Sequence, residues 1–315
     1  MKDIVIIGAG PAGLSAALYG ARAGMDLAVI DSNYMAGGQV LTTYEVDNYL
    51  GLPGINGFDM GMKFQEHVAK FGVEILSYTV ERIEHVKGEA AEGLEIGMPY
   101  FIVHTEQEDI SCKTVLLATG AVNRKLEIPG EEEFLGRGVG YCATCDGAFY
   151  RGKVTAVVGG SYQAVEDAIY LAGLCEKVYL IHRRDKLRAG AVLEEQLKKL
   201  SNVEIVWDSI PLEISGDRAV DKLLVKNVKT QEEQMLKVDG VFVAIGTKPS
   251  TSLAEGLVKL DEQGYVIAGE NGDTNLEGFY VAGDIRTKQL RQIVTAVADG
   301  ANAVTAAWNY VEHMK

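Results

Sequence analysis

Short apolar segments alternate with glycine-rich turns and helical patterns from the first residues of the chain onward. Lys2 to Ile7 is a run rich in β-branched residues, and Leu27 to Ile30 is a second apolar run. Runs of this length and composition predict buried parallel strands. Between them, Ala12 to Ala23 carries a helical pattern that ends at Gly24. The chain is therefore predicted to open with a β–α–β unit.

The turn inside this unit has the composition of a dinucleotide site. Gly8-Ala9-Gly10-Pro11-Ala12-Gly13 joins strand to helix, and Asp31 follows the second strand. Glycines at this spacing let the backbone approach a pyrophosphate at a helix N-terminus, and the acid accepts from a ribose hydroxyl. An acid at that position favours an adenine dinucleotide without a 2′-phosphate, such as FAD. The candidate cofactor-binding residues here are Gly8, Gly10, Ala12, Gly13 and Asp31.

The same pattern recurs in the middle of the chain. Val154 to Val158 and Val178 to Ile181 are predicted strands, and Gln163 to Gly173 is the predicted helix between them. The turn is Gly159-Gly160-Ser161-Tyr162-Gln163-Ala164. A second dinucleotide site is therefore expected in this region.

Basic residues rather than an acid follow the second strand of this central unit. They are His182-Arg183-Arg184, with Arg188 close behind. A cluster of guanidinium groups suits a 2′-phosphate, which favours NADPH, although the same residues could form a solvated helix start. The candidate residues of the second site are Gly159, Gly160, Ser161, Gln163, His182, Arg183, Arg184 and Arg188.

A third glycine motif lies near the end of the chain. Gly278 to Ala282 is predicted to be a strand that runs into Gly283-Asp284, before a predicted helix from Ile293 to Tyr310. A strand ending in Gly-Asp beside a helix start can hold the pyrophosphate and ribityl chain of a flavin, although the pair alone would indicate only a turn.

Two further glycines bracket the central unit. Ala118-Thr119-Gly120 and Ala244-Ile245-Gly246 each follow an apolar strand, and glycines there suit chain crossings between domains. The predicted fold is α/β, with two Rossmann-like three-layer nucleotide-binding domains. The NADPH domain, residues 118–246, is inserted into a discontinuous FAD domain formed by residues 1–117 and 247–315.

Cys142-Ala143-Thr144-Cys145 is the motif that predicts redox chemistry. Two cysteines at this spacing cycle easily between dithiol and disulfide, and a flavin can pass two electrons to such a disulfide. A zinc site would need a second Cys or His pair, and the five histidines are scattered, so no metal site is expected. The other two cysteines, Cys112 beside a strand and Cys175 late in a helix, are expected to be buried apolar residues.

Asp146 directly follows this motif. A carboxylate there could supply or take a proton as the thiolates form and leave. The alternative is a turn residue, because Asp-Gly is a common turn pair.

Composition narrows the function classes. The 315 residues are 47% hydrophobic and 23% charged, as in a folded protein of about two domains. A net charge of −14 argues against nucleic-acid binding, which needs a basic surface. The apolar runs are too short to span a bilayer, and Ile4-Val5-Ile6-Ile7 lacks the basic lead-in of a signal peptide. With only four cysteines, the cytoplasm is the expected location.

Taken together, these motifs resemble the bacterial low-molecular-weight thioredoxin reductase family over essentially the whole chain. The resemblance rests on Gly8-x-Gly10-x-x-Gly13, Gly37-Gly38-Gln39, Ala118-Thr119-Gly120, Cys142-Ala143-Thr144-Cys145-Asp146-Gly147, His182-Arg183-Arg184, Gly283-Asp284, and Arg291-Gln292 with Thr295-Ala296. The C-A-T-C-D-G and R-Q-x-x-T-A segments come closest to being diagnostic alone.

The resemblance implies a homodimeric FAD enzyme that reduces thioredoxin with NADPH. It implies that Cys145 is the thiol next to the flavin and that Cys142 attacks thioredoxin. It also makes Asp146 the family's acid and Phe149 part of the thioredoxin contact. The further FAD-site residues that it indicates are Gly38, Gln39, Asn48, Thr119, Gly120, Gly283, Asp284, Arg291 and Gln292.

The order of the motifs has a mechanical consequence. The dithiol and the nicotinamide site both fall in the central domain, yet both need the same flavin. Rotation of that domain about its crossings near Gly120 and Gly246 is therefore expected.

One position departs from the family pattern. The family usually has a third consecutive glycine in the second turn, where this chain has Ser161 followed by Tyr162. A Cβ at that position would crowd the pyrophosphate or change the turn, unless the serine hydroxyl bonds a phosphate oxygen.

Two alternatives to an NADPH-dependent thioredoxin reductase stay open. One is a flavin disulfide reductase of the same fold with another donor, such as ferredoxin. The other is a non-catalytic flavin redox sensor, against which Asp146 beside the dithiol argues.

Overall fold

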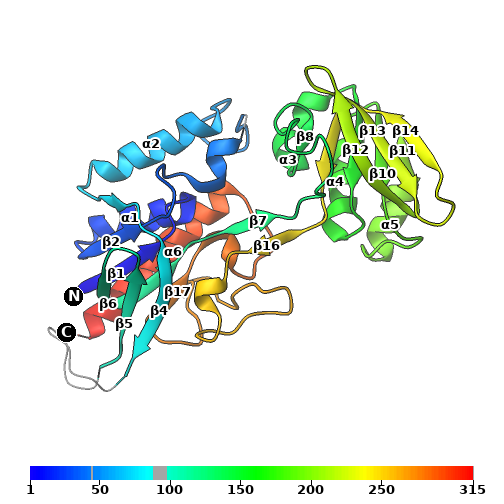
Figure 1. Cartoon of the computed structure of the whole chain (residues 1–315). Helices are drawn as coiled ribbons and strands as arrows, with labels where there is room; N and C mark the ends of the chain where they lie inside the picture. The colour runs from blue at the N-terminus through cyan, green and yellow to red at the C-terminus, as the bar shows by residue number, and fades with distance from the viewer. Residues whose placement is uncertain (44, 88–97, 315) are drawn as a thin grey trace. The chain divides into compact units, whose positions relative to one another are not determined.

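The computed structural model describes residues 1–43, 45–87 and 98–314 (Figure 1). The chain forms two compact units. The first unit comprises Met1–Val122 and Lys248–Lys315, and the second unit comprises Asn123–Thr247. The boundaries predicted from sequence, at residues 117 and 246, lie a few residues before two strands, β7 (Ala121–Asn123) and β16 (Thr247–Pro249), which pair with each other.

The first unit is built on a mixed sheet. Within the described residues it has seven strands in the order β3-β2-β1-β6-β5-β4, with β17 also pairing β6. The long strand β6 is antiparallel to β5 near its start and parallel to β1 and β17 near its end. The strands are β1 (Lys2–Ile7), β2 (Leu27–Ile30), β3 (Ile75–Leu76), β4 (Val80–Val86), β5 (Tyr100–Thr105), β6 (Asp109–Leu117) and β17 (Phe279–Val281). The helices are α1 (Pro11–Arg22), α2 (Gly57–Ala69) and α6 (Ile293–His313), with 3-10 turns η1 (Gly38–Thr42), η3 (Ser252–Ala254) and η4 (Gly283–Ile285).

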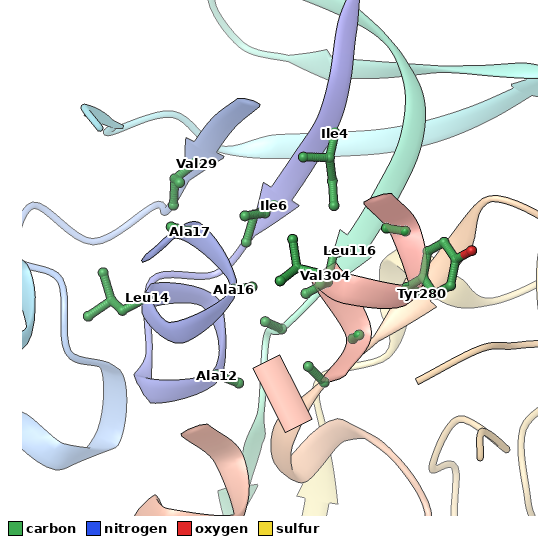
Figure 2. Close-up of a cluster of buried hydrophobic side chains, with 14 of the residues drawn as sticks. Ile4, Ile6, Ala12, Leu14, Ala16, Ala17, Val29, Leu116, Tyr280 and Val304 are labelled. Carbon is green, nitrogen blue, oxygen red and sulfur yellow. The ribbon is translucent and has the colours of Figure 1, made fainter. Parts of the chain in front are cut away.

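Helices α1 and α6 pack together against one face of this sheet. Figure 2 shows Ile4 and Ile6 of β1 and Leu116 of β6 grouped with Val304 of α6. Their close approach requires Gly300, because a Cβ there would lie 2.0 Å from the carbonyl oxygen of Ala12. The ends of the chain therefore build one core.

The second unit has three layers. A five-stranded parallel sheet, in the order β11-β10-β9-β15-β8, lies between helices and a three-stranded antiparallel sheet, β12-β13-β14. Alternate residues of one strand serve the two faces: Val157 packs with the helices, and Ala156 and Val158 pack with the antiparallel sheet. The strands are β8 (Val139–Gly140), β9 (Val154–Val158), β10 (Lys177–Ile181), β11 (Val203–Val206), β12 (Ser209–Gly216), β13 (Val220–Asn227), β14 (Glu233–Lys237) and β15 (Gly240–Val243). The helices are α3 (Ala143–Asp146), α4 (Tyr162–Ala172) and α5 (Ala191–Lys198), with the 3-10 turn η2 (Gly147–Tyr150).

The α/β fold and the predicted β–α–β strands are confirmed. The predicted helices are confirmed with small shifts, since α1 and α4 each begin one residue earlier and α6 continues to His313. The placement of Cys175 in a helix is wrong, because α4 ends at Ala172 and Cys175 lies in the bend before β10. In the described part of the chain, no helix is both long and apolar enough to cross a membrane.

Candidate redox and cofactor sites

The C-x-x-C motif forms a disulfide at the start of α3. Cys142 and Cys145 are bonded to each other, and the backbone N–H of Cys145 donates to Cys142 Sγ at 3.2 Å. Ala143 between them is buried and packs with Ala164 and Ala168 of α4, which anchors the motif on the second unit. Both half-cystines are half-buried rather than enclosed, as a disulfide that exchanges with external thiols must be.

Asp146 carries a titratable carboxyl directly beside this disulfide. Burial raises the pKa of Asp146 to about 6. The carboxylate lies over Gly140, where a Cβ would meet Asp146 Oδ2 at 3.0 Å. A carboxyl with this pKa can exchange a proton near neutral pH, as a general acid or base must.

The three glycines of the first turn have different roles. Gly8 has φ +104° and a Cβ there would lie 2.5 Å from Ala118 O, whereas a Cβ on Gly13 would lie 1.8 Å from Gly8 O. Those two glycines are required by packing. At Gly10 the nearest atom to an added Cβ is Gly38 Cα at 4.0 Å, so the turn is open at that point. Open space at the N-terminus of α1 fits a bound pyrophosphate.

Asp31 contacts the turn from the end of β2. Its Oδ2 accepts from the backbone N–H of Ala9 at 2.6 Å, and its Oδ1 accepts from the N–H of Asn33 at 2.8 Å. The carboxylate therefore fixes the turn. Its expected bond to a ribose hydroxyl stays a prediction.

Asp284 is brought to the same turn from the far end of the chain. Its neighbour Gly283 has φ +81°, and a Cβ there would lie 3.0 Å from Ala12 Cβ at the start of α1. Asp284 Oδ1 is buried and has no hydrogen-bond partner among the residues that the structure describes. An unpaired buried acceptor is costly unless a ligand satisfies it. This oxygen and the open face of Gly10 fit FAD, which offers hydroxyl donors and a pyrophosphate.

The other candidates for this site are held by neighbours in the first unit. Asn48 Nδ2 donates to Gln292 Oε1 at 2.9 Å, and Gln292 caps α6. Gln39 Nε2 donates to the carbonyl oxygen of Ala121. These contacts fix side chains on three separate segments of the chain.

Two contacts support the loops around this site. The Arg291 guanidinium lies 4.0 Å from the centre of the Tyr265 ring. Thr119 Oγ1 donates to Ser250 O at 2.7 Å, beside Gly120. The structure thus gathers the first group of candidates in the first unit, while the second glycine turn belongs to the second unit.

The second glycine turn is tightly packed. A Cβ on Gly159 would lie 2.4 Å from Ala244 O, and a Cβ on Gly160 would lie 2.1 Å from the His182 ring. His182 is buried, and its Nε2 lies 3.0 Å from Lys186 O. Burial lowers the pKa of His182, so this residue packs the turn as a neutral ring.

Ser161 is the N-cap of α4. Its Oγ accepts from the backbone N–H of Ala164 at 3.4 Å, and its φ of −82° is one that any residue adopts. This position therefore does not require a glycine for its backbone conformation, and the expected effect of its Cβ on a pyrophosphate stays a prediction. The hydroxyl occupies an N–H at the helix N-terminus, where a pyrophosphate would bind.

The arginine cluster is exposed beside this turn. The backbone N–H of Arg188 donates to Gly160 O at 2.8 Å, which brings the loop to the glycines. The side chains of Arg183, Arg184 and Arg188 make no hydrogen bond or ion pair with residues that the structure describes. Three free guanidinium groups fit a phosphate ligand.

The buried charges that follow Asp284 in the chain were not clearly indicated by the sequence. Arg286, Lys288 and Asp299 form an ion cluster there. The only sequence signal was two cations just after Gly283-Asp284, and their partner lies more than ten positions away. No spacing rule would have paired them.

Known proteins resemble this chain in sequence and fold over nearly its whole length. The family model for pyridine nucleotide-disulphide oxidoreductases matches residues 2–300. The chain belongs to that family. The thioredoxin reductase of Bacillus subtilis is 39% identical over 314 residues, which cover 99% of this chain and 96% of that protein.

Two solved structures extend the comparison. Thioredoxin reductase from Streptococcus pyogenes is 41% identical with a TM-score of 0.90, and 99% of each chain is covered. A ferredoxin-flavin thioredoxin reductase from Clostridium acetobutylicum is 33% identical with a TM-score of 0.52, covering 99% of this chain and 98% of that one.

Within the family, the chain is a low-molecular-weight thioredoxin reductase with a redox-active Cys142–Cys145 disulfide. Its activity is that of a thioredoxin-disulfide reductase. Family membership implies FAD and a nicotinamide nucleotide as cofactors and thioredoxin as substrate.

Proposed function

We propose that this reductase takes electrons from NADPH, passes them through FAD to the Cys142–Cys145 disulfide, and reduces thioredoxin. The observation that carries the proposal is a half-buried disulfide beside a titratable Asp146, on a chain with two dinucleotide turns. The first unit holds FAD through the open face of Gly10 and the unpaired oxygen of Asp284. The second unit holds the NADPH 2′-phosphate through its free arginines. The enzyme works in the cytoplasm as a homodimer.

The protein's own residues carry the later steps. When bound, FAD supplies two-electron transfer to the disulfide, which no side chain performs. Reduction breaks the S–S bond, and Asp146 holds the proton that accompanies the two thiolates. Cys142 then attacks the thioredoxin disulfide to form a mixed disulfide, and Cys145 resolves it, which restores the internal disulfide and releases reduced thioredoxin.

Movement of the second unit completes the cycle. The disulfide and the arginine cluster belong to the second unit, and both must serve the flavin of the first. Gly120 and Gly246, beside the crossing strands β7 and β16, have φ of +68° and +103° with no atom near an added Cβ. Such glycines can absorb the backbone change of a hinge.

Anaerobic titration tests the proposal. The purified protein should be yellow with one FAD per chain, and NADPH should bleach it, because hydride transfer reduces the flavin. Oxidised thioredoxin should then restore the colour. A colourless, folded protein that ignores added FAD would contradict the flavin assignment.

Ferredoxin is a second candidate for the electron donor. Ser161 and Tyr162 depart from the family's glycine pattern, and one relative is described as a ferredoxin-flavin thioredoxin reductase. If reduced ferredoxin bleaches the flavin and no nicotinamide does, this donor replaces NADPH.

Changing Ser161 to Gly should tighten NADPH binding. The change frees the Ala164 N–H and removes a Cβ, so the gain should be near one net hydrogen bond, about 0.5–1.5 kcal/mol. Stability should fall by only about a few tenths of a kcal/mol, because glycine is tolerated at an N-cap. Direct NADPH titration measures the effect, and Ser161→Ala, which keeps the Cβ, separates the two causes. Weaker binding in both variants would instead make the hydroxyl a phosphate ligand.

A further inference from the structure

A buried ion cluster lies behind the segment that carries Asp284. Asp299 of α6 accepts four hydrogen bonds from that segment. Arg286 donates from Nε at 2.8 Å and from Nη2 at 2.7 Å, the backbone N–H of Gly283 donates at 3.0 Å, and Lys288 Nζ donates at 2.9 Å. The side chains of Arg286, Lys288 and Asp299 are each at most 9% exposed. Asp299 therefore anchors the segment from Gly283 to Lys288 onto α6.

The charges in this cluster do not balance. The bidentate pair with Arg286 already neutralises Asp299. Lys288 then adds a second buried positive charge, and a buried charge is costly unless it is paired. The cluster carries one surplus cation.

The surplus positive charge of Lys288 can stabilise the nearby carboxylate of Asp284. Lys288 Nζ and the N–H of Gly283 donate to the same oxygen of Asp299, so the ammonium lies close to the backbone just before Asp284. Burial raises the pKa of Asp284, while the charges of Lys288 and Arg291 oppose the rise and that of Asp299 adds to it. An ionised carboxylate only accepts hydrogen bonds, whereas a protonated one has lost an acceptor site.

We propose that Lys288, held by Asp299, is a positioning residue that keeps Asp284 ionised as an acceptor for the hydroxyls of bound FAD. The inference rests on the proposed FAD site. It adds that a buried charge without contact to the ligand sets the affinity of that site.

FAD binding to the apoprotein tests the inference through a double-mutant cycle. Lys288→Met removes the charge and leaves Asp299 paired with Arg286. The FAD dissociation constant, read from quenching of flavin fluorescence, should rise about tenfold, as for loss of a bond to a charged group. In an Asp284→Asn background, Lys288→Met should alter the FAD dissociation constant less than about threefold, because the carboxylate that Lys288 stabilises is then absent.

Three variants keep the result interpretable. Lys288→Arg retains the charge and should restore wild-type affinity. Lys288→Gln can still donate to Asp299 and covers the case in which Lys288→Met fails to fold. Lys113→Met is the matched control, since Lys113 is also mostly buried and paired with Asp3 at 2.7 Å in the first unit, and it should leave FAD affinity unchanged.

Two outcomes would overturn the inference. They are unchanged affinity in both Lys288→Met and Lys288→Gln, and equal losses with and without the Asp284 carboxylate. If the wild-type apoprotein itself does not bind FAD, the proposed function fails instead.

Discussion

Replacing Cys145 with serine should abolish electron transfer from the flavin to the disulfide, while NADPH still bleaches the flavin. The disulfide cannot form without this sulfur, so bleached flavin has no acceptor within the protein. Reduction of thioredoxin should fall to background in a coupled assay, because the step has no alternative route. Rapid-mixing absorbance measures the flavin step separately from turnover.

Replacing Cys142, the other cysteine of the disulfide, identifies which sulfur faces the flavin. Cys142→Ser should leave a Cys145 thiolate against oxidised flavin, visible as a long-wavelength charge-transfer band. Cys112→Ala is the control, because this thiol is free and buried in β6, and it should keep both bleaching and turnover. A band in the Cys145 variant, with none in the Cys142 variant, would reverse the roles of the two cysteines.

Changing Arg183 and Arg184 to alanine should erode the preference for NADPH over NADH by roughly ten- to a hundredfold, at about 1.4 kcal/mol per decade. Each bond from a guanidinium to a phosphate contributes about 1.5–3 kcal/mol, and the lower end applies to exposed groups that solvent screens. The measurement is the ratio of kcat/KM for the two nucleotides. The loss should fall on NADPH, because NADH has no 2′-phosphate for these side chains to bind.

A matched arginine separates specific binding from general charge. Arg218 is exposed in the same unit, in the hairpin between β12 and β13, and Arg218→Ala should leave the ratio unchanged. Equal use of NADPH and NADH by the wild-type protein would remove the basis for a phosphate pocket at these arginines.

The elements predicted best from sequence are those with strong local signals. The strands β1, β2, β9 and β10 are apolar runs that end in glycine turns or in the residues expected to bind nucleotide, and each was found within one residue of its predicted bounds. The antiparallel sheet β12-β13-β14 was not anticipated. Its strands mix exposed charges with buried residues, as in β13, and only packing on the parallel sheet buries Leu223 and Val225.

The candidate site was predictable where motifs are contiguous. Three short segments could be recognised from their residue types alone: the C-x-x-C disulfide, the first glycine turn and Gly283-Asp284. What the sequence could not supply is the pairing of distant charges. The partner of Arg286 and Lys288 is an aspartate within the long apolar helix α6, and only the folded chain brings the three together.

The structure also gives single residues contacts that the sequence did not predict. Asp31 was expected to face a ribose, yet its carboxylate also bonds the backbone of the turn it follows. Ser161 was expected either to crowd the pyrophosphate or to bond it, and its hydroxyl also caps the helix that follows. Both side chains were recognised as belonging to nucleotide turns, and in each case the backbone conformation determined which nearby N–H the oxygen would accept.

Because the first unit is formed by two separate parts of the chain, the two units must complete folding in a fixed order during synthesis. The second unit is one continuous stretch and can finish folding while the chain beyond Thr247 is still being made. The first unit, begun earlier, must wait, since Ser15 of α1 bonds Val297 of α6, 282 positions away. Until Phe279–Val281 emerges, the half of β6 that it will pair has a free edge. That interval of synthesis is when a nascent chain of this topology is most open to misassembly with its neighbours.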